Sequence, residues 1–215
     1  MSWRQVVLWR HGRTEWNVAG RVQGQSDVPL DDVGRQQARE AAARLAALNP
    51  YRIVSSDLLR ASETARILSE VTSKEVEFDP RLREMDFGAR EGLTWAEAWE
   101  QFPDGMQAWI DGDETQIPGS ETHRQAGERF AAALNDHLED LPHKGVLVVV
   151  AHGAVLRTGA CAFLEIPEEH WSTFGGLGNC SWSVLEEWSR DDWSKWRLTE
   201  WNAGTLPEPV LSDDE

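Results

Sequence analysis

Cysteine is scarce in this chain. Cys161 and Cys180 are the only two in 215 residues, and they form no Cys-x-x-Cys pair. This excludes a disulfide-rich secreted module and a cysteine-rich zinc site, and it predicts two small core residues in a reducing compartment. Neither HExxH nor other metal-ligand spacing occurs, and no Walker A loop is present, so we expect neither a bound metal nor a nucleotide-driven kinase or NTPase.

Long apolar runs are also missing. None approaches the ~20 residues that a membrane-spanning helix needs, and the N-terminal residues do not form a signal-peptide pattern. These absences predict a cytoplasmic protein with no membrane partner.

Positive charge is in deficit. Lys and Arg number 21 against 37 Asp and Glu, which gives a net charge of −16. So acidic a chain is not expected to bind nucleic acid or anionic membranes. A small anionic substrate is still compatible with it, because a local Arg cluster acts at contact range while distant acidic groups are screened.

Short apolar segments alternate with amphipathic ones along the chain. We expect strands at about residues 5–10, 51–55, 76–78 and 145–151, and two closing strands at 180–187 and 195–201. Helices are expected at about 31–48, 56–71 and 154–164, and over most of 94–141. This alternation predicts an α/β fold, a three-layer α/β/α sandwich with a mostly parallel central sheet.

The length and the 40% hydrophobic content predict a single domain over residues 1–205, followed by an acidic tail at 206–215. The mainly helical stretch at about 94–141 is expected to be an insert or lid beside the sheet. Thr94 and Glu97 form a capping box at its start. Ser56 or Asp57 is expected to cap the helix at 56–71.

Two of the predicted strands end in the same way. His11-Gly12 follows the first strand, and His152-Gly153 follows the strand at 145–151. In α/β sheets ligands collect beyond the carboxyl ends of the strands, so the two imidazoles are expected to meet there if the strands are parallel neighbours. The helix that begins after Gly153 would aim its backbone N–H groups at the same place, which favours an anion.

Arginines are expected at the same edge of the sheet. Arg10 directly precedes His11, and Arg60 lies near the start of the helix after the second strand. Guanidinium groups match phosphate oxygens, so this set predicts a phosphate site. A neutral His11 could attack phosphorus to give a phosphohistidine that water later hydrolyses. Glu84, on the loop after the third strand, is the expected proton donor and later base.

Each of these residues taken alone also has a purely structural interpretation. A buried histidine is commonly just hydrogen-bonded, and Arg60 or Glu84 alone could be surface residues. The prediction depends on the repeated strand-His-Gly pattern. The other four histidines lie in polar segments where surface roles are expected: His123, His137, His143 and His170.

These motifs resemble the histidine phosphatase superfamily, which is also called the phosphoglycerate-mutase-like family. The match runs in order along nearly the whole chain. The segments that carry it are residues 10–17 (RHGRTEWN), 23–24, 30–34, 55–61, 64–65, 82–88, 91–92 and 151–153. The resemblance implies the phosphoglycerate-mutase-like fold, no cofactor, and a homodimer.

The resemblance also implies roles for individual residues. His11 would be the phosphorylated nucleophile and Glu84 the proton donor, with Arg10, Arg60 and His152 forming the phosphate pocket. The implied contacts to substrate or phosphate are Asn17, Gln23, Gly24 and Gly153, with Thr14 shaping the loop. Arg13 departs from the common pattern, and we expect it either to bind a second acidic group of the substrate or to be an exposed loop residue.

Phosphatases and phosphoglycerate mutases of this superfamily share the same phosphate pocket, so other residues must distinguish them. The acid Glu84 is followed here by Met85-Asp86-Phe87-Gly88, whereas the cofactor-dependent mutases have an Arg-His-Tyr-Gly stretch at this place. Hydrolysis of a phosphomonoester is therefore favoured over phosphoglycerate mutase activity. A catalytically silent phosphate-binding scaffold is the third interpretation. The C-terminal segments 175–182, 196–198 and 201–203 resemble glucosyl-3-phosphoglycerate phosphatases, although their tryptophans could equally pack the closing strands.

Overall fold

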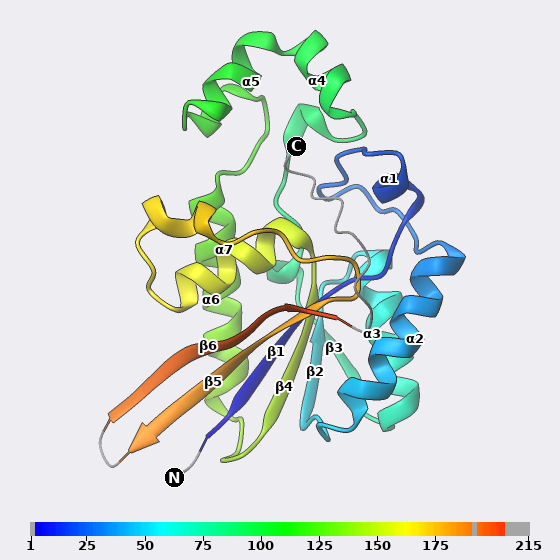
Figure 1. Cartoon of the computed structure of the whole chain (residues 1–215), viewed down its shortest axis with the longest axis vertical. Helices are drawn as coiled ribbons and strands as arrows, with labels where there is room; N and C mark the ends of the chain where they lie inside the picture. The colour runs from blue at the N-terminus through cyan, green and yellow to red at the C-terminus, as the bar shows by residue number, and fades with distance from the viewer. Residues whose placement is uncertain (1–2, 191–192, 205–215) are drawn as a thin grey trace.

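The computed structural model describes residues 3–190 and 193–204. Its centre is a six-stranded sheet in the order β3-β2-β4-β1-β5-β6 (Figure 1). Strands β3, β2, β4 and β1 are mutually parallel, and β5 runs antiparallel to β1 and to β6. The strands are β1 (Gln5–Arg10), β2 (Arg52–Ser55), β3 (Val76–Phe78), β4 (Val146–Ala151), β5 (Trp182–Arg190) and β6 (Trp193–Ala203).

Helices make up the rest of the regular structure. The α-helices are α1 (Glu15–Val18), α2 (Asp32–Ala46), α3 (Leu59–Thr72), α4 (Trp95–Gln101), α5 (Pro103–Ile110), α6 (His123–Glu139) and α7 (Gly153–Phe163). The short 3-10 helices are η1 (Pro80–Leu82), η2 (Gly88–Arg90), η3 (Glu114–Gln116) and η4 (Glu168–Thr173). No helix of the described ranges is both long enough and apolar enough to cross a bilayer.

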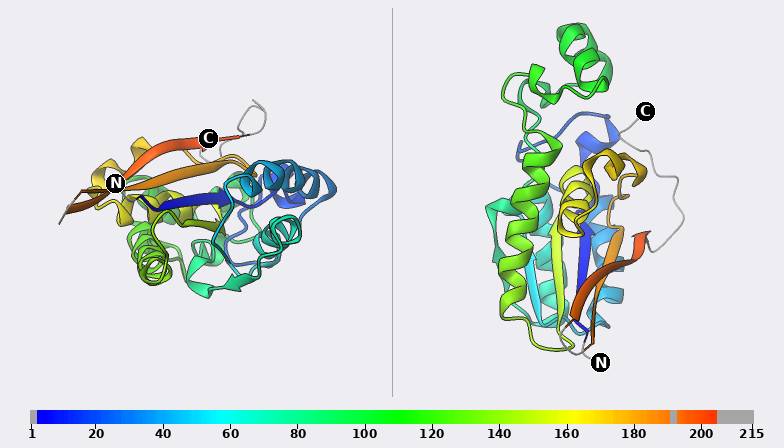
Figure 2. Two further views of the ribbon diagram at one scale, coloured as in Figure 1. Left: turned by 90° about the horizontal axis from the view of Figure 1, so that it is seen from below. Right: turned by 90° about the vertical axis from the view of Figure 1, so that its left-hand side faces the viewer.

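The alternation of side chains along β1 separates two hydrophobic cores. Val6 and Leu8 point to the face covered by α6 and α7, and Val7 and Trp9 point to the face covered by α2 and α3. Figure 2 shows helices on both sides of the strands. Every residue of β4 is buried, as expected for a central parallel strand. The predicted three-layer sandwich with a mostly parallel sheet is therefore confirmed.

The predicted insert at 94–141 is only partly correct. Helix α6 packs against α7, and Phe130 and Leu134 belong to the main core, so this helix is part of one outer layer. The segment that stands above the carboxyl edge of the sheet is shorter, residues 93–120, and contains α4, α5 and η3 (Figure 1). We call it the cap segment. The amphipathic stripe of α6 has the same periodicity whether it faces a lid or a sheet, which is why the sequence did not separate the two.

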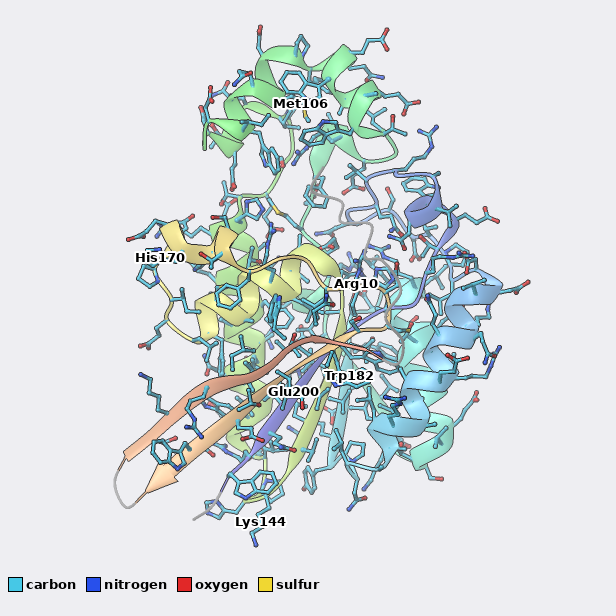
Figure 3. All side chains as sticks on the ribbon, viewed as in Figure 1. Arg10, Met106, Lys144, His170, Trp182 and Glu200 are labelled. Carbon is cyan, nitrogen blue, oxygen red and sulfur yellow. The ribbon has the colours of Figure 1, made fainter. Side chains whose placement is uncertain are left out.

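The cap segment has a small core of its own. Ala98, Met106 and Ile117 are buried in it, and Figure 3 shows Met106 well above the sheet edge at which Arg10 lies. Its ends are tied to the main body by two isolated bridges, Arg21 with Thr94 and Phe87 with Ser120. The predicted capping box of Thr94 and Glu97 is present at the start of α4.

Two further expectations have clear outcomes. The residue that caps α3 is Leu58, which gives no side-chain hydrogen bond, so the predicted cap by Ser56 or Asp57 is wrong. Asp57 instead accepts a 2.7 Å hydrogen bond from Arg83. Cys161 and Cys180 are free and buried, as predicted. The predicted acidic tail at 206–215 lies outside the described residues.

Candidate active site

The site is built where β1 and β4 end side by side. The two strands pair in parallel with Arg10 opposite Ala151, so the next residue of each strand, His11 and His152, reaches the same edge. The His11 N–H donates to the Ala151 carbonyl at 3.0 Å, which continues the ladder by one step. The imidazole centroids are 5.1 Å apart and inclined by 58°. Two segments 141 positions apart thus bring two nearly inaccessible rings together, as the repeated motif predicted.

The tautomer of His11 is fixed by its own backbone. Its Nδ1 lies 2.7 Å from the carbonyl oxygen of Gly12, which can only accept, so Nδ1 carries the proton and Nε2 keeps its lone pair. Burial lowers the pKa of His11 well below its usual 6.5, and the guanidinium groups of Arg60 and Arg10 lower it further. His11 is therefore a neutral imidazole with a free nitrogen, which is the form that a nucleophile needs.

His152 is held by a hydroxyl group from the neighbouring strand end. Its Nε2 lies 2.8 Å from the Ser56 hydroxyl. Its Nδ1 is buried and has no hydrogen-bond partner among the described residues. Burial, reinforced by Arg60 and other nearby cationic groups, lowers the pKa of His152 well below 6.5. A second neutral imidazole thus stands beside the nucleophile.

Backbone carbonyls aim the two predicted arginines. Arg60 donates to the Ser26 carbonyl at 2.8 Å and to the Gly24 carbonyl at 2.6 Å, and it is fully buried. Its Nε has no hydrogen-bond partner within the described part of the chain. Burial lowers the pKa of Arg60 to about 10, so it is still a cation at neutral pH. Arg10 donates to the Leu177 carbonyl.

Glu84 occupies the N-terminus of α7. Its carboxylate accepts hydrogen bonds from the backbone N–H groups of Ala154 at 3.1 Å, Val155 at 2.8 Å and Met85 at 2.9 Å. The expectation that these helix N–H groups would point at a phosphate is therefore wrong for Ala154 and Val155, since a carboxylate of the same chain takes them. The same bonds deliver Glu84 to the edge where His11 lies.

A cavity of about 340 Å³ opens between this edge and the cap segment. The predicted residues that line it are Arg10, His11, Asn17, Gln23, Gly24, Arg60, Glu84 and Gly153. A Cβ on Gly153 would lie 3.4 Å from the Arg10 guanidinium carbon, an ordinary van der Waals contact, so Arg10 packs beside this glycine.

Three predicted binding residues, Arg13, Thr14 and the fully buried His152, are not among the lining residues. Arg13 donates to Asp31 at 2.8 Å, so its guanidinium is paired with an acid of the same loop. This is nearer to the prediction of an exposed loop residue than to that of a substrate contact. Thr14 is buried, caps α1 and donates to the Gln23 side-chain oxygen at 2.9 Å. It thus shapes the loop as expected, and it leaves the Gln23 amide nitrogen available to a ligand.

Several residues that the sequence did not single out as functional support or extend the site. Thr64 accepts from the Gly12 N–H at 3.1 Å and donates to the Arg60 carbonyl at 2.7 Å, linking the two halves of the pocket. Asn179 donates to the His11 carbonyl at 3.2 Å. The cavity is also lined by Trp95, Met106 and Trp109 of the cap segment, and by Arg90, His123 and Arg157 of η2, α6 and α7. Their positions in helices and turns gave no signal of a shared destination.

The C-terminal tryptophans do not line the cavity. The Trp196 ring lies 5.3 Å from that of Phe163, and the Trp201 ring lies 5.3 Å from that of Phe174. Trp182 packs against the core under α2 and α3. These side chains pack the closing strands, which was the second of the two interpretations.

Two buried neutral imidazoles, two arginines and a carboxyl group at the carboxyl edge of a parallel sheet define an α/β enzyme that handles phosphate. Comparison with known proteins agrees. The model of the histidine phosphatase superfamily (branch 1) matches residues 6–204. The chain therefore belongs to the histidine phosphatase superfamily, and the family and phosphatase class predicted from the sequence are confirmed.

Individual relatives cover nearly the whole chain. The glucosyl-3-phosphoglycerate phosphatase of Mycobacterium tuberculosis is 38% identical over 215 residues, which is 94% of this chain and 96% of that protein. A probable phosphoglycerate mutase of Proteus mirabilis, GpmB, is 38% identical over 88% of this chain and 89% of its own. A solved structure of a mycobacterial glucosyl-3-phosphoglycerate phosphatase with VO3 superposes with a TM-score of 0.85 at 37% identity, covering 94% of this chain and 100% of that one.

Proposed function

We propose that this protein hydrolyses a small phosphorylated metabolite, glucosyl-3-phosphoglycerate or a related phosphoglycerate or sugar phosphate, through a phosphohistidine on His11 and without a metal ion. The observation that carries the proposal is the neutral His11, whose Nδ1 carries the proton that bonds the Gly12 carbonyl, whose Nε2 keeps its lone pair, and whose pKa is lowered by burial and by the nearby Arg60 and Arg10. A nucleophile, its fixed tautomer and the charge that receives the phosphate are thus present in one place.

In the first step, His11 Nε2 attacks phosphorus as the bond from phosphorus to the leaving alkoxide breaks. Glu84, in its protonated form, gives the alkoxide its proton. Arg10 and Arg60 lie where the phosphoryl oxygens gather charge, and His152 provides the polar group beside the nucleophile. The products of this step are the free alcohol, phospho-His11 and the Glu84 carboxylate.

In the second step, water enters the position that the alcohol leaves. The Glu84 carboxylate takes a proton from the water as its oxygen bonds to phosphorus and the bond between phosphorus and Nε2 breaks. Inorganic phosphate is released, and His11 returns to the neutral form with its proton on Nδ1. The balance of the cycle is one ester and one water converted to one alcohol and one phosphate.

The substrate assignment is supported by the relatives named glucosyl-3-phosphoglycerate phosphatase and by the size of the cavity, since about 340 Å³ lies at the lower end of the usual range for small-molecule sites. Hydrolysis, rather than mutase chemistry, is supported by Met85-Asp86-Phe87-Gly88 after Glu84.

We also propose, from the sequence, a cytoplasmic homodimer with no nucleic-acid or membrane partner. Light scattering tests the oligomeric state of the protein, and cell fractionation tests its location.

The test is a panel of phosphorylated sugars, glycerates and glucosyl-3-phosphoglycerate, with phosphate release as the readout. We expect glucosyl-3-phosphoglycerate to give the highest kcat/KM and His11→Ala to abolish turnover. Formation of 2-phosphoglycerate from 3-phosphoglycerate and trace bisphosphoglycerate, without phosphate release, would show a mutase. No turnover of any ester and no acid-labile phosphohistidine would show a silent binding protein.

A further inference from the structure

We propose that Arg90 is a specificity-determining residue that binds a second anionic group of the substrate, a carboxylate, at the cap side of the cavity. This inference rests on the proposed function, because it concerns the part of the substrate that is not transferred. Arg90 ends η2, six residues after Glu84, and lines the same cavity as His11.

The guanidinium of Arg90 lies over two aromatic rings. Its central carbon is 5.1 Å from the centroid of Phe87 and 5.0 Å from that of Trp109. The residue is 3% exposed. The two rings attract the cation through their π systems, but they supply no oxygen acceptor for its N–H groups.

The edge of this guanidinium is short of partners. Nε and Nη2 of Arg90 are buried and have no hydrogen-bond partner among residues 3–190 and 193–204. These are the two nitrogens that form the side-on fork of an arginine, which takes both oxygens of one carboxylate. A buried charged donor without a partner is costly, so the position favours a ligand that supplies acceptors.

Other arginines of this protein show what the same fork binds. Arg4 uses Nε and Nη2 to hold both oxygens of Glu187, at 2.7 and 2.8 Å. Arg129 does the same with Glu121, at 2.7 and 2.8 Å. In each case the acceptor is a carboxylate of the chain. The fork of Arg90 is more deeply buried than these, whose side chains are 22% and 21% exposed, and it lies at a ligand cavity instead.

Among the described residues, the one acidic side chain whose charge acts on Arg90, Glu114, does not bind its fork. Glu114 acts on Arg90 only through its charge, while its carboxylate binds both the ring and the backbone N–H of His123. Among the other cations that line the cavity, Arg21 is paired with Glu97 at 2.8 Å, and Arg60 with two carbonyls. Arg90 differs from these two in that both nitrogens of its side-on fork, Nε and Nη2, have no partner within the described part of the chain.

Access to the fork requires a small movement. Nε and Nη2 have almost no accessible surface in this structure, so a carboxylate reaches them when the guanidinium or a neighbouring side chain shifts, and the Trp109 ring is one such neighbour. Trp109 lies on α5 of the cap segment, which is tied to the main body at its ends and has its own small core. Such a carboxylate, on the carbon chain beyond a phosphate held by Arg10 and Arg60, is the arrangement found in a phosphoglycerate.

The experiment compares glucosyl-3-phosphoglycerate with its carboxamide, in which –CONH2 replaces the carboxylate. Wild-type enzyme should prefer the carboxylate substrate by about 10- to 100-fold in kcat/KM, the effect of one charge-assisted bidentate pair. Arg90→Gln should lose this preference by losing rate on the carboxylate substrate alone. 4-Nitrophenyl phosphate, which has only the phosphate group, should be hydrolysed equally by both proteins.

Arg197→Gln is the matched control, because that guanidinium also lies over a tryptophan ring, 4.6 Å from the centroid of Trp188, but away from the cavity. It should keep the full preference. Arg90→Lys, which keeps the charge without the fork, should keep part of the preference for the carboxylate substrate. It also tests the proposal if Arg90→Gln does not fold.

Three outcomes separate the two proposals. A wild-type enzyme that hydrolyses both substrates equally overturns the role of Arg90 and leaves the proposed function standing. A preference for the carboxylate substrate that survives Arg90→Gln also overturns the role of Arg90. It would show that another cation, such as Arg157, binds the carboxylate. A wild-type enzyme that hydrolyses neither substrate refutes the proposed substrate and this inference with it.

Discussion

The stability of this protein should fall between pH 7 and pH 5 because of His11 and His152. Both have pKa values well below the usual 6.5 in the folded chain, chiefly through burial and then through Arg60 and Arg10. In the unfolded chain their pKa values return to about 6.5. As pH falls through 6.5, the unfolded chain takes up two protons that the folded chain does not. Stability is therefore complete above this value and is lost below it.

The magnitude follows from the linkage relation. One histidine that is neutral in the folded state down to pH 5 contributes a loss of about 2 kcal/mol between pH 7 and pH 5, and the two together about 4 kcal/mol. This is a large part of the 5–15 kcal/mol that a typical domain has. Asp57 and Asp79 have pKa values lowered from 3.8, so their contributions are lost only below about pH 4 and do not enter this window.

Urea unfolding at pH 5, 6 and 7 measures the effect. The buffers must be free of phosphate, since a bound anion would stabilise the protonated rings. His11→Gln and His152→Gln should each remove about half of the pH dependence whatever they do to stability at pH 7, and the exposed His170 gives the control variant. A wild-type slope that survives in both single variants would refute the claim that buried neutral imidazoles cause it.

Three further outcomes are expected. Glu84→Gln should lower kcat by about 10²-fold or more on alkyl phosphates and much less on 4-nitrophenyl phosphate, whose leaving group needs no proton; equal losses on both would remove Glu84 as the acid. Gly12→Ala would place a Cβ 2.4 Å from the Gly34 carbonyl oxygen and should lower Tm by about 3–10 °C, whereas Gly175→Ala, with open space around it, should not. EDTA should leave phosphate release intact, and a metal-restorable loss would contradict the arginine-based mechanism.

The reacting half of the site was predictable because sheet geometry places it. A histidine after a buried parallel strand can only reach the carboxyl edge, so His11 and His152 needed no knowledge of the loops. Arg60 followed from its place near the start of a helix after a neighbouring strand. The prediction failed for the N-terminus of α7, because the sequence does not show that the Glu84 carboxylate reaches its N–H groups.

The binding half was not predictable for a different reason. Arg90, Trp109 and Arg157 lie on three separate elements, and none of them continues a strand. Their meeting depends on how the cap segment is placed over the sheet, which bridges such as Phe87 with Ser120 decide. The same limit explains the width of the predicted insert, since the apolar stripe of α6 does not say which surface it covers.

These two halves differ in how freely they can change. Arg10, His11 and His152 are held by the strand ladder, by hydrogen bonds and by burial, so a substitution among them disturbs the fold and the reaction together. The cap segment has its own core around Met106 and meets the body at its ends. Its cavity residues can therefore be replaced at little cost to the sheet. A protein of this architecture can therefore keep one phosphoryl-transfer chemistry while its substrate preference changes through the cap segment and the residues beside it, such as Arg90.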